Sequence, residues 1–260
     1  MARIIAIANQ KGGVGKTTTA INLAGSLAEQ GYRVLCVDMD PQANLTVGLG
    51  INLRNVERSI ADALVDSNVT LDEIIVPTQT PSVDVAPSTI DLSATENVLF
   101  SAIGREQALR DVLQSPAAER YDYVLIDCPP TLGLLTLNAL VAADAVLIPL
   151  HCEYFALEGL ADLVGTMRRV RAALNPALDI DGVLLTMFDE RTNLGQQVAN
   201  DVRQFFKEKV FRTVIPRNVR LGEAPSHGMP VILYDVKSRG AEAYLALARE
   251  VMERAAATAA

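Results

Sequence analysis

One short stretch near the N-terminus limits the possible folds of this chain more than any other. An apolar run at residues 4–8 leads into the glycine-rich segment 9–19, which reads Asn-Gln-Lys-Gly-Gly-Val-Gly-Lys-Thr-Thr-Thr. After it, apolar residues recur at helical spacing through residues 20–28. The pattern predicts a buried strand, a tight turn and a helix, in that order. This is the context that a phosphate-binding loop requires.

The residue types in this loop suit the binding of a triphosphate. Glycines allow the backbone to approach an anion closely, and successive N–H groups at a helix N-terminus then point toward it. Lys16 is placed to reach the β and γ phosphates, and the Thr17 hydroxyl is placed to hold Mg²⁺. The segment therefore predicts binding of a nucleoside triphosphate with magnesium.

The loop departs from the general pattern G-x-x-x-x-G-K-[ST] at its start. That pattern requires a glycine at position 10, where this chain has Gln10, and a second lysine, Lys11, opens the loop instead. The segment Lys11–Thr17 resembles the deviant Walker A loop of the ParA/MinD ATPase superfamily. In that superfamily the first lysine crosses a dimer interface and touches the nucleotide of the partner subunit. The alternative is that Lys11 is an ordinary solvated loop lysine.

Composition indicates one α/β domain over residues 1–260. No Pro/Gly/Ser-rich linker divides the 260 residues, half of which are hydrophobic, and the chain has no Trp. No apolar run is long enough to span a membrane, and the start of the chain leaves no room for a signal peptide. Cys36, Cys128 and Cys152 lie in apolar stretches without CxxC spacing, so we expect reduced, buried thiols in a cytoplasmic protein. An iron–sulfur or redox role lacks the spacing it needs.

The charge is unevenly distributed along the chain. The net charge of −8 argues against a globally basic nucleic-acid binder, yet residues 203–220 contain six basic residues and one acidic residue. This asymmetry leaves room for a local patch that contacts an anionic partner.

Two further segments place carboxylates at the ends of predicted strands. Asp38 and Asp40 follow an apolar strand at 33–37, and we expect this strand to lie beside the first one. Asp127 ends another apolar strand, and two prolines then stop it. Because ligands collect at the C-terminal edge of a parallel sheet, Asp38 and Asp40 are candidates for the metal and the γ-phosphate. Asp127 resembles a Walker B aspartate, and the alternative is a helix N-cap.

The rest of the chain alternates strands and helices, which predicts a mostly parallel twisted sheet with helices on both faces, like that of P-loop NTPases. Further strands are expected at 83–87, 145–150, 182–187 and 214–216. Helices are expected at 60–65, 71–75, 92–98, 107–113, 156–174, 194–206 and 241–254. Phe205 and Phe206 are interpreted as core residues. The stretch 51–115 carries no recognisable chemical motif.

Beyond the loop, six segments extend the resemblance over nearly the whole chain, to the ParA/Soj chromosome- and plasmid-partitioning ATPases. They are residues 38–42, 127–130, 153–159, 215–220, 225–228 and 238–240. The resemblance implies an ATP hydrolase that uses ATP and Mg²⁺. It implies a homodimer that forms on ATP binding, binds double-stranded DNA without sequence preference, and is released when a ParB-type centromere-binding protein stimulates hydrolysis. It also implies a cytoplasmic, nucleoid-associated protein with no membrane partner.

The resemblance also implies roles for individual residues. The loop residues Gly12, Gly13, Val14 and Gly15 would bind phosphates through their backbone, with Lys16 at the γ-phosphoryl group and Thr18 near the α-phosphate. Asp40 would orient the attacking water, Thr17 and Asp127 would hold Mg²⁺, Asp38 would lie in the outer shell of the metal, and Lys11 would act across the dimer. Adenine contacts would come from Pro216, Asn218 and Met187, although Met187 is equally well explained as a core residue. The candidates for DNA phosphate contact, each of which could instead be a solvated charge, are Arg191, Lys207, Lys209, Arg212, Arg220, Lys237 and Arg239.

Three other classes of protein remain as alternatives. A MinD-like membrane-associated cell-division-site ATPase would need a basic amphipathic C-terminal helix, whereas residues 249–260 carry mixed charge and an alanine-rich tail. A nitrogenase-reductase-type electron-transfer ATPase would need paired cysteines. A regulatory DNA-binding protein would need a helix-turn-helix module, and none is expected because the chain begins at the strand before the loop.

Overall fold

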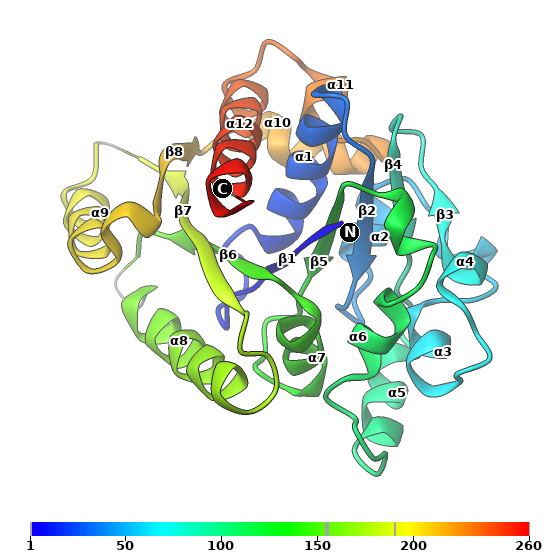
Figure 1. The fold of residues 1–260 in the computed structure, drawn as a ribbon. Coiled ribbons are helices and arrows are strands. Elements are labelled where there is room, and N and C mark those ends of the chain that lie inside the picture. The colour runs from blue at the N-terminus through cyan, green and yellow to red at the C-terminus, as the bar shows by residue number, and fades with distance from the viewer. Residues whose placement is uncertain (1, 154–155, 190, 260) are drawn as a thin grey trace.

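A central sheet of eight strands carries the chain, and helices cover both of its faces (Figure 1). The computed structural model describes residues 2–153, 156–189 and 191–259. The strand order is β3-β4-β2-β5-β1-β6-β7-β8, and every pair is parallel except β3 with β4. The predicted α/β class is confirmed.

The strands are β1 Arg3–Ile7, β2 Val34–Asp38, β3 Val76–Pro77, β4 Val83–Ala86, β5 Tyr123–Asp127, β6 Ala145–His151, β7 Asp179–Phe188 and β8 Val210–Pro216. The α-helices are α1 Lys16–Glu29, α2 Asn44–Gly48, α3 Ile60–Val65, α4 Leu71–Ile74, α5 Leu92–Leu99, α6 Ala108–Leu113, α7 Leu134–Ala142, α8 Ala156–Ala173, α9 Asn193–Phe206, α10 Val219–Glu223, α11 Val231–Tyr234 and α12 Arg239–Ala259. Short 3₁₀ turns are η1 Leu53–Asn55, η2 Ala118–Arg120, η3 Lys207–Lys209 and η4 Ala224–His227.

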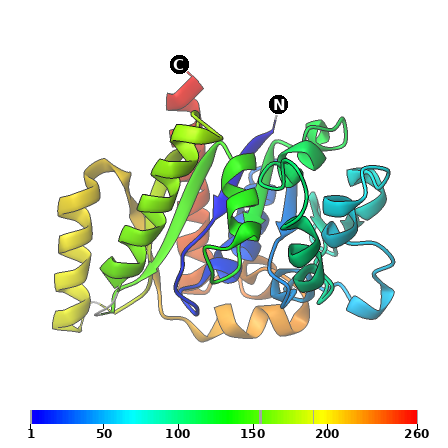
Figure 2. The ribbon, with the colours of Figure 1, turned by 90° about the horizontal axis from the view of Figure 1, so that it is seen from below.

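The sheet separates two hydrophobic cores, because successive side chains of a strand point to opposite faces. Ile5 and Ile7 of β1 belong to the core under α1 and α12, whereas Ala6 of β1 and Ala8, directly after it, belong to the core under α7 and α8. Figure 2 shows α7 and α8 on the near face of the sheet. Burial on both faces explains why the inner strands read as continuous apolar runs.

The expected neighbour of β1 is wrong. β2 was predicted to lie beside β1, but it pairs with β4 and β5, and β5 occupies the position between β1 and β2. After α1 the chain thus leaves the position beside β1 open, and β5 later occupies it. As a result Asp127, at the end of β5, lies next to the loop strand, and Asp38 lies one strand farther away.

Most predicted elements agree with the structure to within a few residues, and the exceptions have physical causes. The sequence pattern missed α7, because nearly all of its residues are buried and it has no polar face to give a helical period. Phe205 is not in the core: it is 71% exposed, since Val198, Ala199 and Val202 occupy the buried face of α9. Phe206 is partly buried against the core.

The C-terminal helix packs onto the protein rather than away from it. In α12, Tyr244, Leu247 and Val251 are buried in the core that also contains α1. In the part of the chain that the structure describes, no helix is both long and apolar enough to cross a bilayer. The apolar residues of α12 named above are therefore covered by the protein core and are not exposed to solvent.

Candidate nucleotide site

The glycine-rich loop joins the end of β1 to the start of α1 and depends on glycine at two positions. Gly13 and Gly15 have φ angles of 72° and 90°, a left-handed conformation that other residues rarely adopt. Gly15 is also the N-cap of α1. A glycine-rich loop of this conformation at a helix N-terminus is typical of sites that bind an anion through backbone N–H groups.

Neighbouring strands hold the loop in place. The Thr186 hydroxyl on β7 donates a hydrogen bond of 2.8 Å to the Val14 carbonyl. The Asn9 amide donates to the Pro149 carbonyl on β6 at 2.7 Å, and its oxygen accepts from the Lys11 N–H at 3.0 Å. These bonds fix the loop before any ligand is bound, which lowers the entropy that ordering on binding would otherwise require.

Lys16 lies inside the loop with its ammonium group only slightly accessible. The residue is 7% exposed, and its Nζ donates to the Lys11 carbonyl at 3.2 Å. Burial lowers the pKa of Lys16, and the nearby carboxylate of Asp127 opposes that shift. A buried cation with one weak partner at the mouth of an N–H-lined loop is suited to bind an anion.

Asp127 is the residue of the site whose surroundings best fit a bound cation. It is fully buried at the end of β5, directly opposite Ile7 of β1 and Asp38 of β2 in the strand register. Neither of its carboxylate oxygens has a hydrogen-bond partner of good geometry, although the Thr17 hydroxyl lies close enough to lower its pKa somewhat. Burial and the neighbouring Asp38 together raise the pKa of Asp127 well above its usual value. The residue is not an N-cap, because the next helix begins at Leu134 with Gly133 as its cap.

An unpartnered carboxylate beside a threonine hydroxyl fits a Mg²⁺ ion bound together with phosphate. Among the described residues, no three His, Cys, Asp or Glu side chains gather closely enough to form a metal cage. Magnesium is usually held by one or two protein oxygens, with water and substrate phosphates completing its coordination. The donor set of Thr17 and Asp127 is of this kind.

Asp38 and Asp40 have different surroundings from Asp127. Asp38 is fully buried, but its oxygens accept from the Asp40 N–H at 3.1 Å, from the Thr46 N–H at 2.9 Å and from the Thr46 hydroxyl at 2.7 Å. Burial raises the pKa of Asp38 to about 6 in spite of these bonds. Asp38 thus anchors the loop that carries Asp40. Asp40 is 9% exposed, faces the pocket, and accepts a bond of 3.0 Å from the Gln42 N–H.

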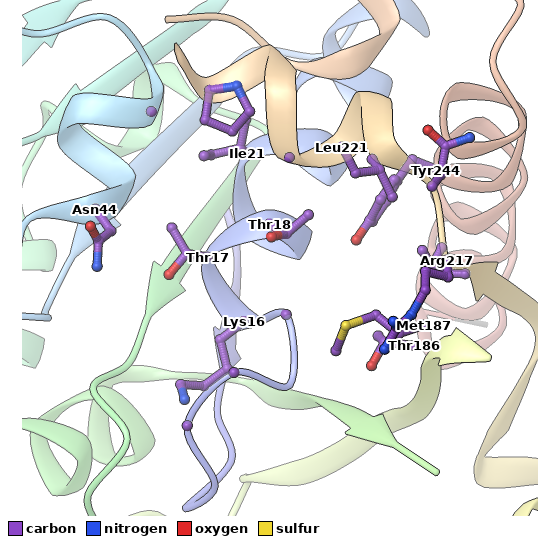
Figure 3. Close-up of a pocket in the computed structure, with 18 of the residues that line it drawn as sticks. Lys16, Thr17, Thr18, Ile21, Asn44, Thr186, Met187, Arg217, Leu221 and Tyr244 are labelled. Carbon is purple, nitrogen blue, oxygen red and sulfur yellow. The ribbon is translucent and has the colours of Figure 1, made fainter. Parts of the chain in front are cut away.

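A pocket of about 940 Å³ opens in front of the loop, and the predicted phosphate and adenine residues line the same space, except for the buried Val14. Figure 3 shows Lys16, Thr17 and Thr18 on one side of it and Thr186, Met187 and Arg217 on the other. Pro216 and Asn218 also line it, as do Gly12, Gly13, Gly15 and Asp40. The volume is in the range typical of sites for nucleotide-sized ligands.

Met187 and Asn218, two of the predicted adenine contacts, line the pocket in different ways. Met187 is half-buried rather than a core residue, lines the pocket, and has a φ of +48°, which is unusual for a residue with a side chain. Asn218 is the N-cap of α10, and its side-chain oxygen accepts from the Arg220 N–H at 2.9 Å. Only the remaining polar groups of Asn218 are therefore free to face a base.

Several lining residues were not predicted from the sequence. They include Ile21, Gln42, Asn44, Thr186, Arg217, Leu221, Pro225, Ser226 and Tyr244. Arg217 lies between two predicted residues, so its position in the segment 215–220 was an available signal. Thr186 and Tyr244 come from strands and helices without a motif, and only the fold brings them to the pocket.

Lys11 is neither freely solvated nor in the pocket of its own chain. Its Nζ forms an ion pair with Glu153 Oε2 at 2.7 Å, and the other oxygen of Glu153 lies 3.0 Å from His151 Nδ1. The Lys11 and Glu153 side chains are 34% and 49% exposed. The two residues that follow Glu153 in the resemblance segment, Tyr154 and Phe155, lie outside the described residues.

The candidate DNA contacts fall into two kinds. Four of them are paired within the chain: Arg191 with Asp189, Lys209 with Asp179, Arg212 with Glu250 and Glu253, and Arg220 with Glu223 and Asp235. Within the described ranges, no ion pair is found for Lys207, Lys237 or Arg239, which are exposed. Lys207, Lys237 and Arg239 are therefore better placed to bind a DNA phosphate, because no ion pair within the described residues has to break first.

The three cysteines are buried and form no disulfide, as expected. Burial raises the pKa of Cys36 and Cys128 well above the usual value and that of Cys152 to about 11. Such thiols are poor nucleophiles and metal ligands.

The chain is similar in sequence over most of its length to proteins of known family. Residues 2–180 match a protein family described as an AAA domain. The chain is 57% identical over 251 residues to the sporulation initiation inhibitor protein Soj of Bacillus subtilis, covering 96% of this chain and 98% of that protein. It is 56% identical over 254 residues to the chromosome partitioning protein ParA of Myxococcus xanthus, covering 98% and 89%.

Two solved structures show the same fold. A cobyrinic acid a,c-diamide synthase from Mycobacterium smegmatis with bound ADP and magnesium has a TM-score of 0.87 and 37% identity, over 99% of this chain and 97% of that one. The cell division ATPase MinD of Pyrococcus furiosus has a TM-score of 0.79 and 30% identity, over 97% and 99%.

Proposed function

The chain belongs to the Soj/ParA family of chromosome partitioning proteins, and from this premise we propose that it is an ATP-dependent DNA-partitioning ATPase. The observation that carries the proposal is the buried, unpartnered carboxylate of Asp127 beside the glycine-rich loop. A site with this donor set gains its missing partner when Mg²⁺ and a triphosphate bind together. Residues 1–260 act in this proposal as one ATPase domain.

Different residues of the pocket would bind the metal, the phosphates and the adenine. Thr17 and Asp127 would hold Mg²⁺, which neutralises charge on the phosphates when bound. The N–H groups of residues 12–15 would bind phosphate oxygens, and Thr18 would lie near the α-phosphate. Lys16 would stabilise the charge that develops on the γ-phosphoryl group, where a preorganised cation in a poorly solvated site is most effective. Met187, Pro216 and Asn218 would face the adenine.

Asp40 would orient the attacking water. The transition state of phosphoryl transfer is loose, so positioning the nucleophile matters more than removing its proton fully. Asp40 is held by the turn to Gln42 and by the loop that Asp38 anchors, which supports a positioning role. Asp38 would lie in the outer shell of the metal.

Lys11 would complete the site of a partner subunit in an ATP-bound homodimer. Support comes from the position of its side chain, which pairs with Glu153 and does not line the nucleotide pocket of its own chain. We expect Lys11→Ala to lose dimerisation and hydrolysis together. We expect Asp40→Ala to keep the ATP dimer and to stop turnover, and normal hydrolysis by this variant would refute the assignment of Asp40.

The ATP dimer would bind nucleoid DNA through exposed basic residues, without sequence preference. A ParB-type partner would stimulate hydrolysis and release the dimer, so that the γ-phosphate acts as the switch. The cellular location in this proposal is the cytoplasm and the nucleoid.

A DNA-binding assay with ATP, ADP and no nucleotide tests the proposal. We expect retention of double-stranded DNA with ATP alone, little dependence on sequence, and a steep loss with salt. Liposomes of anionic lipid serve as the matched control for the alternative, a MinD-like membrane-associated ATPase. DNA binding that ignores the nucleotide, or ATP-dependent binding to liposomes in its place, would contradict the proposal.

A further inference from the structure

The side chain of Lys11 is held in its own chain by a carboxylate that is itself held in place. Glu153 follows β6, which pairs with β1, the strand that leads into the loop. One oxygen of Glu153 accepts from Lys11 Nζ at 2.7 Å, and the other lies 3.0 Å from His151 Nδ1. The Glu153 N–H also donates to the His151 carbonyl at 2.8 Å, which fixes the turn.

The backbone of Lys11 is fixed, so only its side chain is free to exchange partners. Its N–H donates to Asn9 and its carbonyl accepts from Lys16. An ammonium group bound to Glu153 in its own chain is not available to a phosphate in another subunit. Contact with the nucleotide of a partner therefore requires the ion pair with Glu153 to break.

We propose that Glu153, supported by His151, is a positioning residue that holds Lys11 in the separate subunit and so weakens ATP-driven dimerisation. The inference rests on the proposed function, because it assumes that Lys11 acts across a dimer. Lys11 is the largest influence on the pKa of Glu153, which it lowers, and His151 and Arg217 act in the same direction. The hydrogen bond from Lys11, which does most to lower this pKa, keeps the Glu153 carboxylate ionised and able to retain Lys11.

The size of the effect follows from the exposure of the pair. An exposed ion pair changes an equilibrium by a factor of about 1.7 to 4.5. Two such pairs must break for each symmetric dimer, so their removal should tighten the dimer by about three- to twenty-fold. Because exposed pairs are screened, the gain should shrink as NaCl rises from about 50 mM to about 500 mM.

The first experiment measures Lys11 directly in the nucleotide-free protein. Acetylation of lysines by an N-hydroxysuccinimide ester, followed by peptide mass spectrometry, reports the accessibility of each amine. In Glu153→Gln we expect Lys11 to react at least about twofold faster than in the wild type, since it has lost its charged partner. Lys237, which lies far along the chain, is the internal reference. An unchanged rate at Lys11 would overturn the proposal.

The second experiment measures dimerisation with Mg²⁺ and a non-hydrolysable ATP analogue by sedimentation equilibrium. We expect Glu153→Gln to dimerise about three- to twenty-fold more tightly than the wild type at low salt. The control is Glu73→Gln, which removes an ion pair of similar exposure with Arg58 and keeps a glutamine in the capping box of α4. An equal or weaker dimer in Glu153→Gln would overturn the proposal.

The two experiments separate this inference from the proposed function. If the wild type stays monomeric with the analogue, the proposed dimer fails, whatever the acetylation rates. If the wild type dimerises but Glu153→Gln behaves as the wild type does, only the role of Glu153 fails.

Discussion

Replacing Asp127 with asparagine should make the free protein more stable and the nucleotide-bound protein less so. Asp127 is fully buried, has no hydrogen-bond partner of good geometry and lies opposite Asp38 in the strand register. A neutral amide of the same shape costs much less to bury than a carboxylate, and it removes the repulsion from Asp38. We expect the free energy of unfolding to rise by about 1–3 kcal/mol.

This gain is large enough to measure by thermal unfolding. One kcal/mol shifts the Tm of a chain of this size by about 2–4 °C, so the nucleotide-free Asp127→Asn variant should melt about 2–12 °C higher than the wild type. With Mg²⁺ and ATP at about 100 times the Kd, the wild type should gain about 2.7 kcal/mol. The variant should gain little from Mg²⁺, because it has lost the carboxylate proposed to hold the metal.

Asp38→Asn is the matched control, since Asp38 is equally buried but fully hydrogen-bonded to Asp40 and Thr46. An amide cannot accept all of these bonds, so this variant should lose about 1–3 kcal/mol of stability. Opposite signs at two adjacent carboxylates would be hard to explain by a general effect of charge. A nucleotide-free Asp127→Asn protein that melts below the wild type would refute the reasoning.

Three further predictions concern the loop and the basic surface. Gly15→Ala forces a side chain into a left-handed conformation, so thermal unfolding should show a free energy of unfolding lower by about 1–2 kcal/mol. The control, Gly165→Ala inside α8, should raise the free energy of unfolding by about 0.5–1 kcal/mol. Thr186→Val removes the hydroxyl that holds the loop. It should destabilise the protein by about 1–3 kcal/mol and weaken the ATP binding that calorimetry measures. An unchanged affinity for ATP would mean that this hydrogen bond does not shape the loop. Lys237→Ala and Arg239→Ala should each reduce the slope of log K for DNA against log salt by about 0.9, and an unchanged slope would remove that residue from the DNA surface.

The parts of the site that lie within one segment could be predicted from the sequence. Gly13, Gly15, Lys16 and Thr17 form a loop whose conformation is local, since it needs only glycines with positive φ and a helix start. The strand that ends at Asp127 was equally clear from its apolar run and the prolines that follow.

The parts that depend on the order of strands could not be predicted. Nothing local to β2 says that β5 will enter the sheet between it and β1, and this order decides which aspartate lies beside the loop. The exposure of Phe205 depends on how α9 packs, and the pairing of Lys11 with Glu153 depends on how β6 packs beside β1. The spacing of apolar residues in the sequence encodes neither arrangement.

Mixing two inactive variants is the most direct test of whether Lys11 acts across a dimer. Lys11→Ala keeps its own Asp40, and Asp40→Ala keeps its own Lys11, so a mixed dimer contains one nucleotide with both groups in place. Phosphate release should therefore appear in the mixture although neither variant shows it alone. If the mixture releases no more phosphate than the sum of its two components, Lys11 does not serve a neighbouring subunit and the account is contradicted.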